Sequence, residues 1–278
     1  MILICPLCKS QFTKHEKHYA CVNNHCFDIS KQGYVNLLLC DQKKTLNPGD
    51  NKEMVNSRLG FLNQDHYLAI SDKLNAVIVD NLNNDNQLVR IADLGCGVGY
   101  YLKKLKMALD AFEGKKFEYY GFDISKDAIA KAAKTSNVSW VVSSTKNLPI
   151  ANGSIDIILC IFAPFYLDEM QRILNPNGRI YIVTPGNNHL VELKELLYEE
   201  INISKGENIL EKTQEYLALD NCENVTYSLM LNSTEDILNL FKMTPFYWKM
   251  SAQKQAALSS INQLCVTIDM KLWSFVLK

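Results

Sequence analysis

The chain has 278 residues, 47% of them hydrophobic and 21% charged, proportions that suit a folded globular protein and exclude wholesale disorder. This length accommodates one large domain with a small module, or two modest domains. A formal net charge of −1 does not by itself indicate a nucleic-acid-binding protein. No apolar run approaches the roughly 20 residues that span a bilayer, and the N-terminus lacks the features of a secretory signal. We therefore expect a cytoplasmic protein with no membrane partner.

Cysteines cluster at the start of the chain. There are nine in all, an odd number that excludes a fully paired disulfide framework. Cys5 and Cys8 form a C-x2-C pair, and Cys21 precedes the adjacent His25 and Cys26. Thiolates and an imidazole at such spacing can close a tetrahedron around zinc, and four ligands leave no open position for catalysis by the metal. The spacing alone leaves the fourth ligand open between His25 and Cys26.

A boundary between two parts of the chain is predicted near residue 40. Residues 27–39 alternate between apolar and polar side chains, which favours a short strand or hairpin. The polar stretch 42–51 follows and contains Pro48 in a turn signal. We therefore expect a zinc-binding module over residues 1–40, stabilised mainly by its metal, and a second domain over residues 41–278.

The second domain alternates between helical and strand patterns. Residues 51–84 have helical spacing, with a break into two helices at Gly60 or Asp65. Strands are predicted at 89–94, 117–123, 138–143, 154–162 and 179–184, and helices at 99–109, 125–134, 168–174 and 189–201. An N-P-N-G turn at 175–178 separates the last helix–strand pair, and a strand at 224–231 and a helix at 233–241 follow. This alternation predicts a parallel, doubly wound α/β sheet to which the C-terminal part adds strands at one edge.

A glycine-rich loop follows the first strand of this domain. Residues 91–99 read I-A-D-L-G-C-G-V-G and lead directly into a helix. Glycines permit a tight turn and let a ligand approach the backbone closely. A dinucleotide site favours G-x-G-x-x-G, whereas the spacing here is G-x-G-x-G after Asp93. That spacing fits S-adenosylmethionine (SAM), which has no pyrophosphate to seat at the helix start; an NAD-type site or a turn without a ligand is the alternative.

The end of the second strand supports the same interpretation. Asp123 stands there, where a carboxylate can accept hydrogen bonds from adjacent ribose hydroxyls. The loop residues in the predicted SAM site are Gly95, Cys96, Gly97 and Gly99, together with Asp93 and Asp123. Within this set, Cys96 is interpreted as a small filler between the glycines rather than a nucleophile.

Eight motifs occur in a fixed order along the chain: C-P-L-C, C-x3-H, G-Y-V-N-L-L, N-P-G-D, D-L-G-C-G-x-G-Y-Y, A-P, T-P-G-x-x-H-L and M-T-P-F. In this order, over nearly the whole chain, they resemble the bacterial 23S ribosomal RNA (rRNA) guanine-N1 methyltransferases. The resemblance implies a Rossmann-like class I SAM-dependent methyltransferase domain behind a small N-terminal zinc-binding module. It also implies a target guanine in a hairpin loop of large-subunit rRNA, and it is compatible with a homodimer.

The same resemblance implies individual site residues. It implies four zinc ligands: Cys5, Cys8, Cys21 and His25. Cys26 stands where the family has a polar residue. It implies SAM contacts from four residues: Tyr67, Gly97, Val98 and His189. From sequence alone, Tyr67 is equally well interpreted as a helix core residue and His189 as the first residue of a helix. Which of two nearby guanines is modified stays open.

Methylation at guanine N1 requires the loss of the N1 proton, which a carboxylate or a water can accept. Asp168 and Glu169 follow the fourth strand of the sheet and are the candidate catalytic residues. Their plainer interpretation is an acidic first turn of a helix. Phe162, Phe165 or Tyr166 could stack on an extruded base.

Basic residues are concentrated in the N-terminal part. Residues 1–58 hold 8 Lys and Arg against 5 Asp and Glu, a net of +3, whereas residues 59–278 hold 21 against 25, a net of −4. The lysines that could contact RNA phosphates are Lys9, Lys14, Lys17, Lys31, Lys43 and Lys44. The near-zero total charge therefore conceals a basic region suited to RNA.

Two other functional classes compete with an rRNA methyltransferase. One is a SAM-dependent methyltransferase acting on a small molecule or protein, which the zinc-binding module in front argues against. The other is a non-catalytic zinc-bearing RNA-binding protein, which the intact glycine loop and Asp123 argue against.

Overall fold

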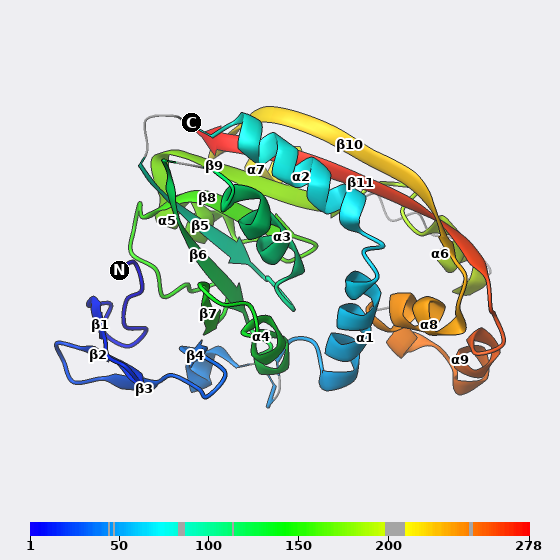
Figure 1. The fold of residues 1–278 in the computed structure, drawn as a ribbon, viewed down its shortest axis with the longest axis horizontal. Coiled ribbons are helices and arrows are strands. Elements are labelled where there is room, and N and C mark those ends of the chain that lie inside the picture. The colour runs from blue at the N-terminus through cyan, green and yellow to red at the C-terminus, as the bar shows by residue number, and fades with distance from the viewer. Residues whose placement is uncertain (44, 47, 83–86, 113, 198–208, 245–246) are drawn as a thin grey trace.

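The computed structural model describes residues 1–278 except 44, 47, 83–86, 113, 198–208 and 245–246. An eight-stranded sheet forms its centre, with the strand order β10-β11-β9-β8-β5-β6-β7-β4 (Figure 1). Its strands are β4 (Val35–Asn36), β5 (Leu88–Leu94), β6 (Lys116–Asp123), β7 (Ser139–Val142), β8 (Ile155–Ile161), β9 (Leu174–Pro185), β10 (Leu217–Leu231) and β11 (Leu264–Leu277).

The five strands β5 to β9 run parallel to one another, as the alternating pattern predicted. Their residues are largely buried, because helices cover both faces of a parallel sheet. The C-terminal strands β10 and β11 extend the β9 edge in antiparallel fashion, which confirms the expected added strands. Strand order reverses between β5 and β8, and ligands bind at the carboxyl ends of strands beside such a reversal.

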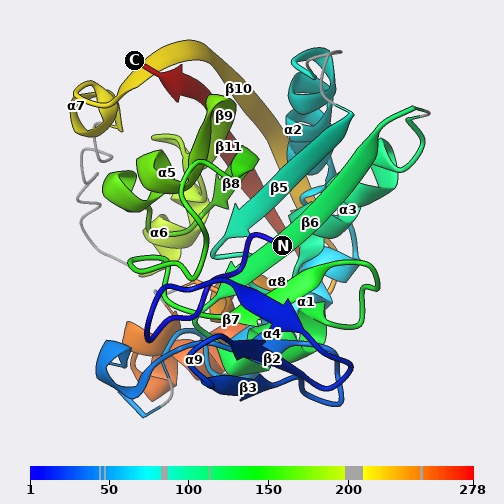
Figure 2. The same cartoon turned by 90° about the vertical axis from the view of Figure 1, so that its left-hand side faces the viewer.

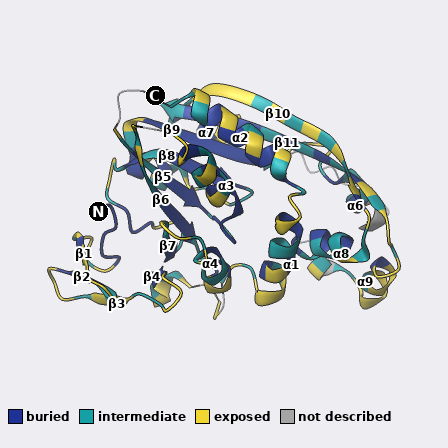
Figure 3. Ribbon diagram, viewed as in Figure 1, coloured by how far each residue is buried: buried dark blue, intermediate teal, exposed yellow. Residues whose placement is uncertain are grey.

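Helices pack on both faces of the sheet (Figures 2 and 3). The helices are α1 (Lys52–Asn63), α2 (Leu68–Asp80), α3 (Tyr100–Leu109), α4 (Lys126–Ala132), α5 (Leu167–Ile173), α6 (Val191–Leu197), α7 (Ile209–Thr213), α8 (Thr234–Lys242) and α9 (Ala252–Leu258), with 3-10 turns at Cys40–Gln42 and Tyr247–Lys249. One core cluster joins side chains of α1 to α4 and α8 to one face. Another joins α5 and the first residues of the chain to the opposite face.

The N-terminal segment forms its own small antiparallel sheet of β1 (Phe12–Lys14), β2 (His18–Cys21) and β3 (Cys26–Asp28). Figure 2 shows this sheet beside β7 at one end of the large sheet. The strand expected within 27–39 is divided: β3 stays in the small sheet, whereas β4 pairs in parallel with β7. The N-terminal segment is therefore joined to the large sheet by strand pairing and not by a linker alone.

Two local expectations have definite outcomes. The long helical stretch breaks near Asp65, whose φ of 57° ends α1 before α2 begins. Residues 175–178, where a turn is expected, fall within the bounds of β9 but pair with neither β8 nor β11, and Asn177 N donates to Asn175 Oδ1 at 3.1 Å. Leu174 pairs with Ile155 before a register shift, so the strand starts earlier than its apolar run. Residues 198–201 of the helix expected at 189–201 lie outside the described residues.

Within the described ranges, no helix is long and apolar enough to cross a membrane.

Candidate metal centre and cofactor site

Four side chains of the N-terminal segment converge on one point. Cys5, Cys8, Cys21 and His25 each offer a ligand atom, and these atoms all lie within 4.8 Å of one another. Cys8 Sγ lies 3.6 Å from Cys21 Sγ, and His25 Nδ1 lies 3.5 Å from both Cys5 Sγ and Cys21 Sγ. A tetrahedral zinc ion, with bonds of roughly 2.3 Å to sulfur and 2.0 Å to nitrogen, requires edges of about 3.5 to 3.8 Å. The four residues therefore fit zinc.

Tight backbone turns bring these ligands together. Lys9, after the first cysteine pair, and Asn24, before His25, both adopt left-handed φ angles, of 60° and 61°. Lys9 N donates to Cys5 O at 2.8 Å, and Asn24 N donates to Cys21 O at 2.9 Å. The Ser10 hydroxyl, 3.0 Å from Cys8 Sγ, lowers the pKa of Cys8 to about 5, and a thiolate is the form that binds zinc.

The position of Cys26 separates the two alternatives for the fourth ligand. It is exposed on β3 and lies outside the cluster, whereas His25 lies within it. Successive side chains of an extended segment point to opposite sides, so the two neighbours cannot face the same ion. The geometry therefore favours His25.

The glycine loop connects β5 to α3 as its sequence predicts. Gly95, Gly97 and Gly99 have φ angles of 77°, 53° and 78°, which favour glycine. A Cβ on Gly95 would lie 2.4 Å from the Cβ of Ala163, and one on Gly99 would lie 2.5 Å from Trp140 Cη2. At Gly97 the nearest atom would be 3.7 Å away. Two of the glycines are therefore fixed by protein packing, and the third leaves open space for a ligand.

Asp123 ties the end of β6 to this loop. Its Oδ2 accepts a hydrogen bond from Gly97 N, and its Oδ1 accepts one from Ser125 N, both at 2.8 Å. Burial raises the pKa of Asp123. Each carboxylate oxygen has two lone pairs, so one on each oxygen is left for a ribose hydroxyl. Ser125 Oγ also accepts from Ala128 N at 3.3 Å and so caps the start of α4.

Asp93 is a buried carboxylate at the carboxyl end of β5. Only 2% of its surface is exposed, and among the described residues its Oδ1 has no hydrogen-bond partner. Burial and the nearby Asp123 raise the pKa of Asp93 to about 8. A buried polar atom without a partner is costly, and it commonly marks a ligand site. The ammonium and sulfonium groups of SAM suit such a carboxylate, so the residues present fit SAM.

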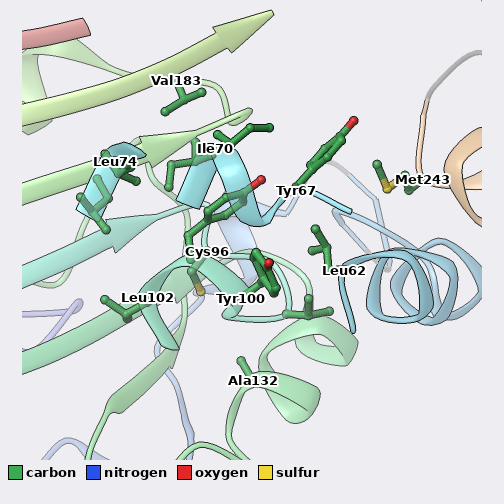
Figure 4. Packing of buried hydrophobic residues seen from close by; sticks show 14 of the residues in the cluster. Leu62, Tyr67, Ile70, Leu74, Cys96, Tyr100, Leu102, Ala132, Val183 and Met243 are labelled. Carbon is green, nitrogen blue, oxygen red and sulfur yellow. The ribbon is translucent and has the colours of Figure 1, made fainter. Parts of the chain in front are cut away.

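Aromatic side chains from distant parts of the chain gather beside the loop, and Figure 4 shows two of them, Tyr67 and Tyr100, near Cys96. The ring of Tyr67 lies 6.1 Å from that of Phe162 and 6.5 Å from that of His189, and Tyr101 lies 6.1 Å from Phe162. Burial lowers the pKa of His189 to about 4, so its ring is neutral. The structure thus brings together Tyr67 and His189, two residues for which the family resemblance implied SAM contacts. Phe162 has a φ of 55°, a strained backbone conformation typical of functional sites.

The two other loop residues of the predicted SAM set are buried. Cys96 and Val98 are each 8% exposed, and burial raises the pKa of the Cys96 thiol. A neutral, buried thiol is consistent with the interpretation of Cys96 as a filler rather than a nucleophile.

Sequence patterns did not indicate Arg58. Its guanidinium pairs with Asp50 at 2.7 Å and donates to Met243 O at 3.3 Å, and its Cδ is the atom nearest to the open side of Gly97. Asp50 O in turn accepts from Ser125 Oγ at 2.8 Å. The N-P-G-D motif contains Asp50 and was the feature of the sequence that marked this segment. The sequence does not show that the segment lies beside the glycine loop, whereas the fold does.

Asp168 and Glu169 have different surroundings in the first turn of α5. Asp168 is exposed. The Glu169 carboxylate accepts from Arg172 Nε at 2.8 Å and from Leu148 N at 2.7 Å. Burial opposes ionisation, but these hydrogen bonds prevail and lower the pKa of Glu169. Such contacts favour a structural role for Glu169 over proton transfer.

The candidate RNA-contacting lysines lie on the surface of the N-terminal segment. Those that the structure describes are all exposed: Lys9, Lys14, Lys17, Lys31 and Lys43. Lys44 lies outside the described residues.

Two family models match the chain. Residues 3–46 match the family described as "RlmA, N-terminal", and residues 85–246 match a methyltransferase domain. A 23S rRNA (guanine(748)-N(1))-methyltransferase of Streptomyces fradiae is 32% identical over 197 residues, covering 70% of this chain and 67% of that protein. YxjB of Bacillus subtilis (strain 168), named as a candidate 23S rRNA (guanine-N(1)-)-methyltransferase, is 27% identical over 273 residues, covering 96% and 94%.

Proposed function

The chain belongs to the family of 23S rRNA guanine-N1 methyltransferases, and from that premise we propose that it methylates N1 of a guanine in a hairpin loop of large-subunit rRNA. The observation that supports this most is a zinc-type ligand cluster and a SAM-type glycine loop in one chain. A methyltransferase that acts on small molecules needs the SAM-type glycine loop but not the zinc-type cluster. A non-catalytic RNA-binding protein has no use for the buried carboxylates beside the loop.

SAM supplies an electrophilic methyl group, so the protein mainly has to hold the donor and the base in line. We assign the ribose hydroxyls to Asp123 and the cationic part of SAM to Asp93, whose Oδ1 has no other partner in the described structure. The open side of Gly97 admits the ligand next to the backbone. The buried ring of Tyr67 and the neutral ring of His189 form an uncharged wall of the site. The remaining loop residues complete the surface that faces SAM: Gly95, Cys96, Val98 and Gly99.

Binding of SAM is expected to release a proton. At pH 7 most Asp93 carboxyls carry a proton in the free protein, because burial and Asp123 raise the pKa to about 8. A positively charged ligand favours the ionised form, so SAM affinity should rise with pH, by up to about tenfold per unit, and level off above pH 8. Calorimetry at pH 7 in buffers of different ionisation enthalpy measures this release. Asp93→Asn should remove the buffer dependence, and a buffer-independent enthalpy for the wild-type protein would contradict the assignment.

The target guanine is proposed to enter beside the loop that follows β8. Phe162 and Phe165 are half-buried there, and Tyr166 is 40% exposed, so an aromatic face is available for an extruded base. The exposed carboxylate of Asp168 is the proposed acceptor of the N1 proton, directly or through a water. Unchanged turnover by Asp168→Asn at saturating RNA would remove it from the mechanism.

Residues 1–40 are proposed to recognise the RNA, and residues 41–278 to carry out methyl transfer. The zinc-type cluster fixes the turns of the first segment, and its exposed lysines can contact phosphates. Hairpin loops offer unstacked bases, which proteins read more easily than paired ones. A substrate within the ribosome also supports the predicted cytoplasmic location. The homodimer stays a prediction.

The substrate class is tested by methyl incorporation from labelled SAM into alternative acceptors. We expect the full chain to label 23S rRNA and a fragment that contains the target hairpin, but neither 16S rRNA nor free guanosine. Equal labelling of guanosine would favour the small-molecule alternative. Binding of SAM without labelling of any RNA or nucleoside would favour a protein acceptor.

A further inference from the structure

Residues 148–152, the bridge segment, lie between the N-terminal segment and helix α5. Ile4 N donates to Pro149 O at 3.0 Å, and Ala151 N donates to Ile2 O at 2.9 Å. The residues bonded in this way directly precede the zinc ligand Cys5 in the chain. The bridge segment is therefore the surface on which the start of the zinc-binding module docks.

Arg172 of α5 holds the bridge segment from the other side. Its Nη1 donates to Ile150 O at 2.6 Å and to Asn152 Oδ1 at 2.8 Å. Its Nη2 donates to Leu148 O at 3.0 Å and to Glu169 Oε2 at 2.9 Å, and its Nε donates to Glu169 Oε1 at 2.8 Å. A guanidinium has five N–H donors in a rigid fork, and here all five are used.

Glu169 completes this arrangement. Its Oε2 accepts from Leu148 N at 2.7 Å in addition to the Arg172 guanidinium, so both side chains hold the same stretch of backbone. Charge-assisted, bidentate pairs of this kind are the strongest and most directional hydrogen bonds in proteins. The pair is only partly exposed, with side-chain accessibilities of 27% for Arg172 and 16% for Glu169.

The same helix begins next to the methyl-transfer site. The chain passes from β8 through Phe162 and Ala163 into α5, and Ala163 contacts the glycine loop at Gly95. A second link from the zinc-binding module runs alongside, since Lys9 Nζ donates to Asn147 Oδ1 at 3.0 Å. The bridge segment is thus held from one side by the metal-binding turns and from the other by the helix that follows the candidate guanine pocket.

We propose that Glu169 and Arg172 are positioning residues that fix the zinc-binding module relative to the methyl-transfer site, so that RNA held by the module presents its guanine to SAM. This inference rests on the proposed function. Neither residue needs to touch the RNA or SAM, since both act through the bridge segment. A rigid connection matters because the RNA must contact the module and the methyl-transfer site together, and a loose connection makes this simultaneous binding weaker.

Arg172→Ala in the full chain tests the proposal. We expect the KM for 23S rRNA to rise about tenfold, which corresponds to about 1.4 kcal/mol, with zinc content and the Kd for SAM unchanged. Hydrogen exchange at Ile4 and Ala151 should accelerate, whereas exchange in the glycine loop should not. Glu169→Gln keeps the side-chain shape but weakens the pair, so a smaller change in the same direction is expected, and this variant serves if Arg172→Ala does not fold.

Arg90→Ala is the matched control, because Arg90 pairs with Glu118 at 3.1 Å without contacting the bridge segment. This variant should leave unchanged the KM for RNA and the hydrogen-exchange rates at Ile4, at Ala151 and in the glycine loop. A lower melting temperature with an unchanged KM for RNA in the Arg172 and Glu169 variants would reduce the pair to a merely structural role and overturn the proposal. Unchanged exchange at Ile4 and Ala151 would overturn it as well. The exchange experiment needs no RNA, so failure of the proposed function, seen as an inactive wild-type protein, is distinguished from failure of this inference.

Discussion

Replacing Cys21 with serine is expected to abolish stoichiometric zinc binding and to weaken binding of 23S rRNA by about 100-fold or more, because structural zinc contributes on the order of 10 kcal/mol to the folding of such modules. Cys21 Sγ lies within 3.6 Å of the ligand atoms of Cys8 and His25, so its loss opens the tetrahedron. The residues assigned to SAM all lie outside the N-terminal segment, most of them on β5, β6 and the loops that follow them, and SAM affinity should therefore persist. Metal analysis, RNA titration and calorimetry with SAM measure the three quantities.

Cys26→Ser is the matched control for this prediction. Cys26 lies close to Cys21 in the chain but is exposed on β3 outside the cluster. The Cys26→Ser protein should retain one zinc ion per chain and wild-type affinity for RNA. Loss of zinc from Cys26→Ser, or full RNA binding by a metal-free Cys21→Ser protein, would contradict the assignment of ligands and of the module's role.

Replacing Asp123 with alanine is expected to raise the Kd for SAM about 100-fold, the equivalent of two lost charge-assisted hydrogen bonds. The Asp123 carboxylate anchors Gly97 N and Ser125 N, and it is our assigned acceptor for the ribose hydroxyls. Its removal therefore takes away a ligand contact and loosens the loop that forms the rest of the site. Calorimetry with SAM, together with the melting temperature of the free protein, separates these two effects.

Asp127→Ala provides the comparison. Asp127 carries the same charge at the start of α4, but it is exposed and makes no contact with the glycine loop among the described residues. SAM affinity should be unchanged in this variant. A similar loss of affinity in both variants would mean that general electrostatics, rather than hydrogen bonding by Asp123, holds the ligand.

The parallel core of the sheet could be predicted because each strand is a short apolar run bounded by turn residues. β8, for example, is buried along nearly its whole length, and only a strand covered on both faces has that composition. The N-P-N-G signal at 175–178 marks an unpaired stretch, but it gave no indication that β9 already begins before that stretch. Leu174 pairs with Ile155 ahead of the main run of β9, a tertiary contact that no local pattern encodes.

The pairing of β4 with the large sheet could not be predicted for a related reason. Only Val35 and Asn36 form it, and their partners in β7 lie more than a hundred residues further along the chain. A strand of two residues has almost no periodicity of its own. Its pairing matters nevertheless, because it attaches the end of the zinc-binding segment to the edge of the catalytic sheet.

The candidate site was predictable where chemistry and spacing coincide, as in C-x2-C and G-x-G-x-G. Spacing alone did not choose between His25 and Cys26, whereas the folded chain places His25 in the cluster and leaves Cys26 exposed on β3. Tyr67 and His189 were implied only by family resemblance, since their rings meet through the fold. Arg172 had no sequence signal, because a basic residue in the last turn of a helix is ordinary.

Nucleoside mapping identifies most directly the atom that receives the methyl group. The full chain is incubated with SAM and unmodified 23S rRNA, the rRNA is digested, and the methylated nucleoside is identified and located by mass spectrometry. We predict 1-methylguanosine at one guanine of a hairpin loop, and its absence when Asp123→Ala replaces the wild-type protein at limiting SAM. A methyl group on another atom or base, or no methylation of 23S rRNA at all, would contradict the account.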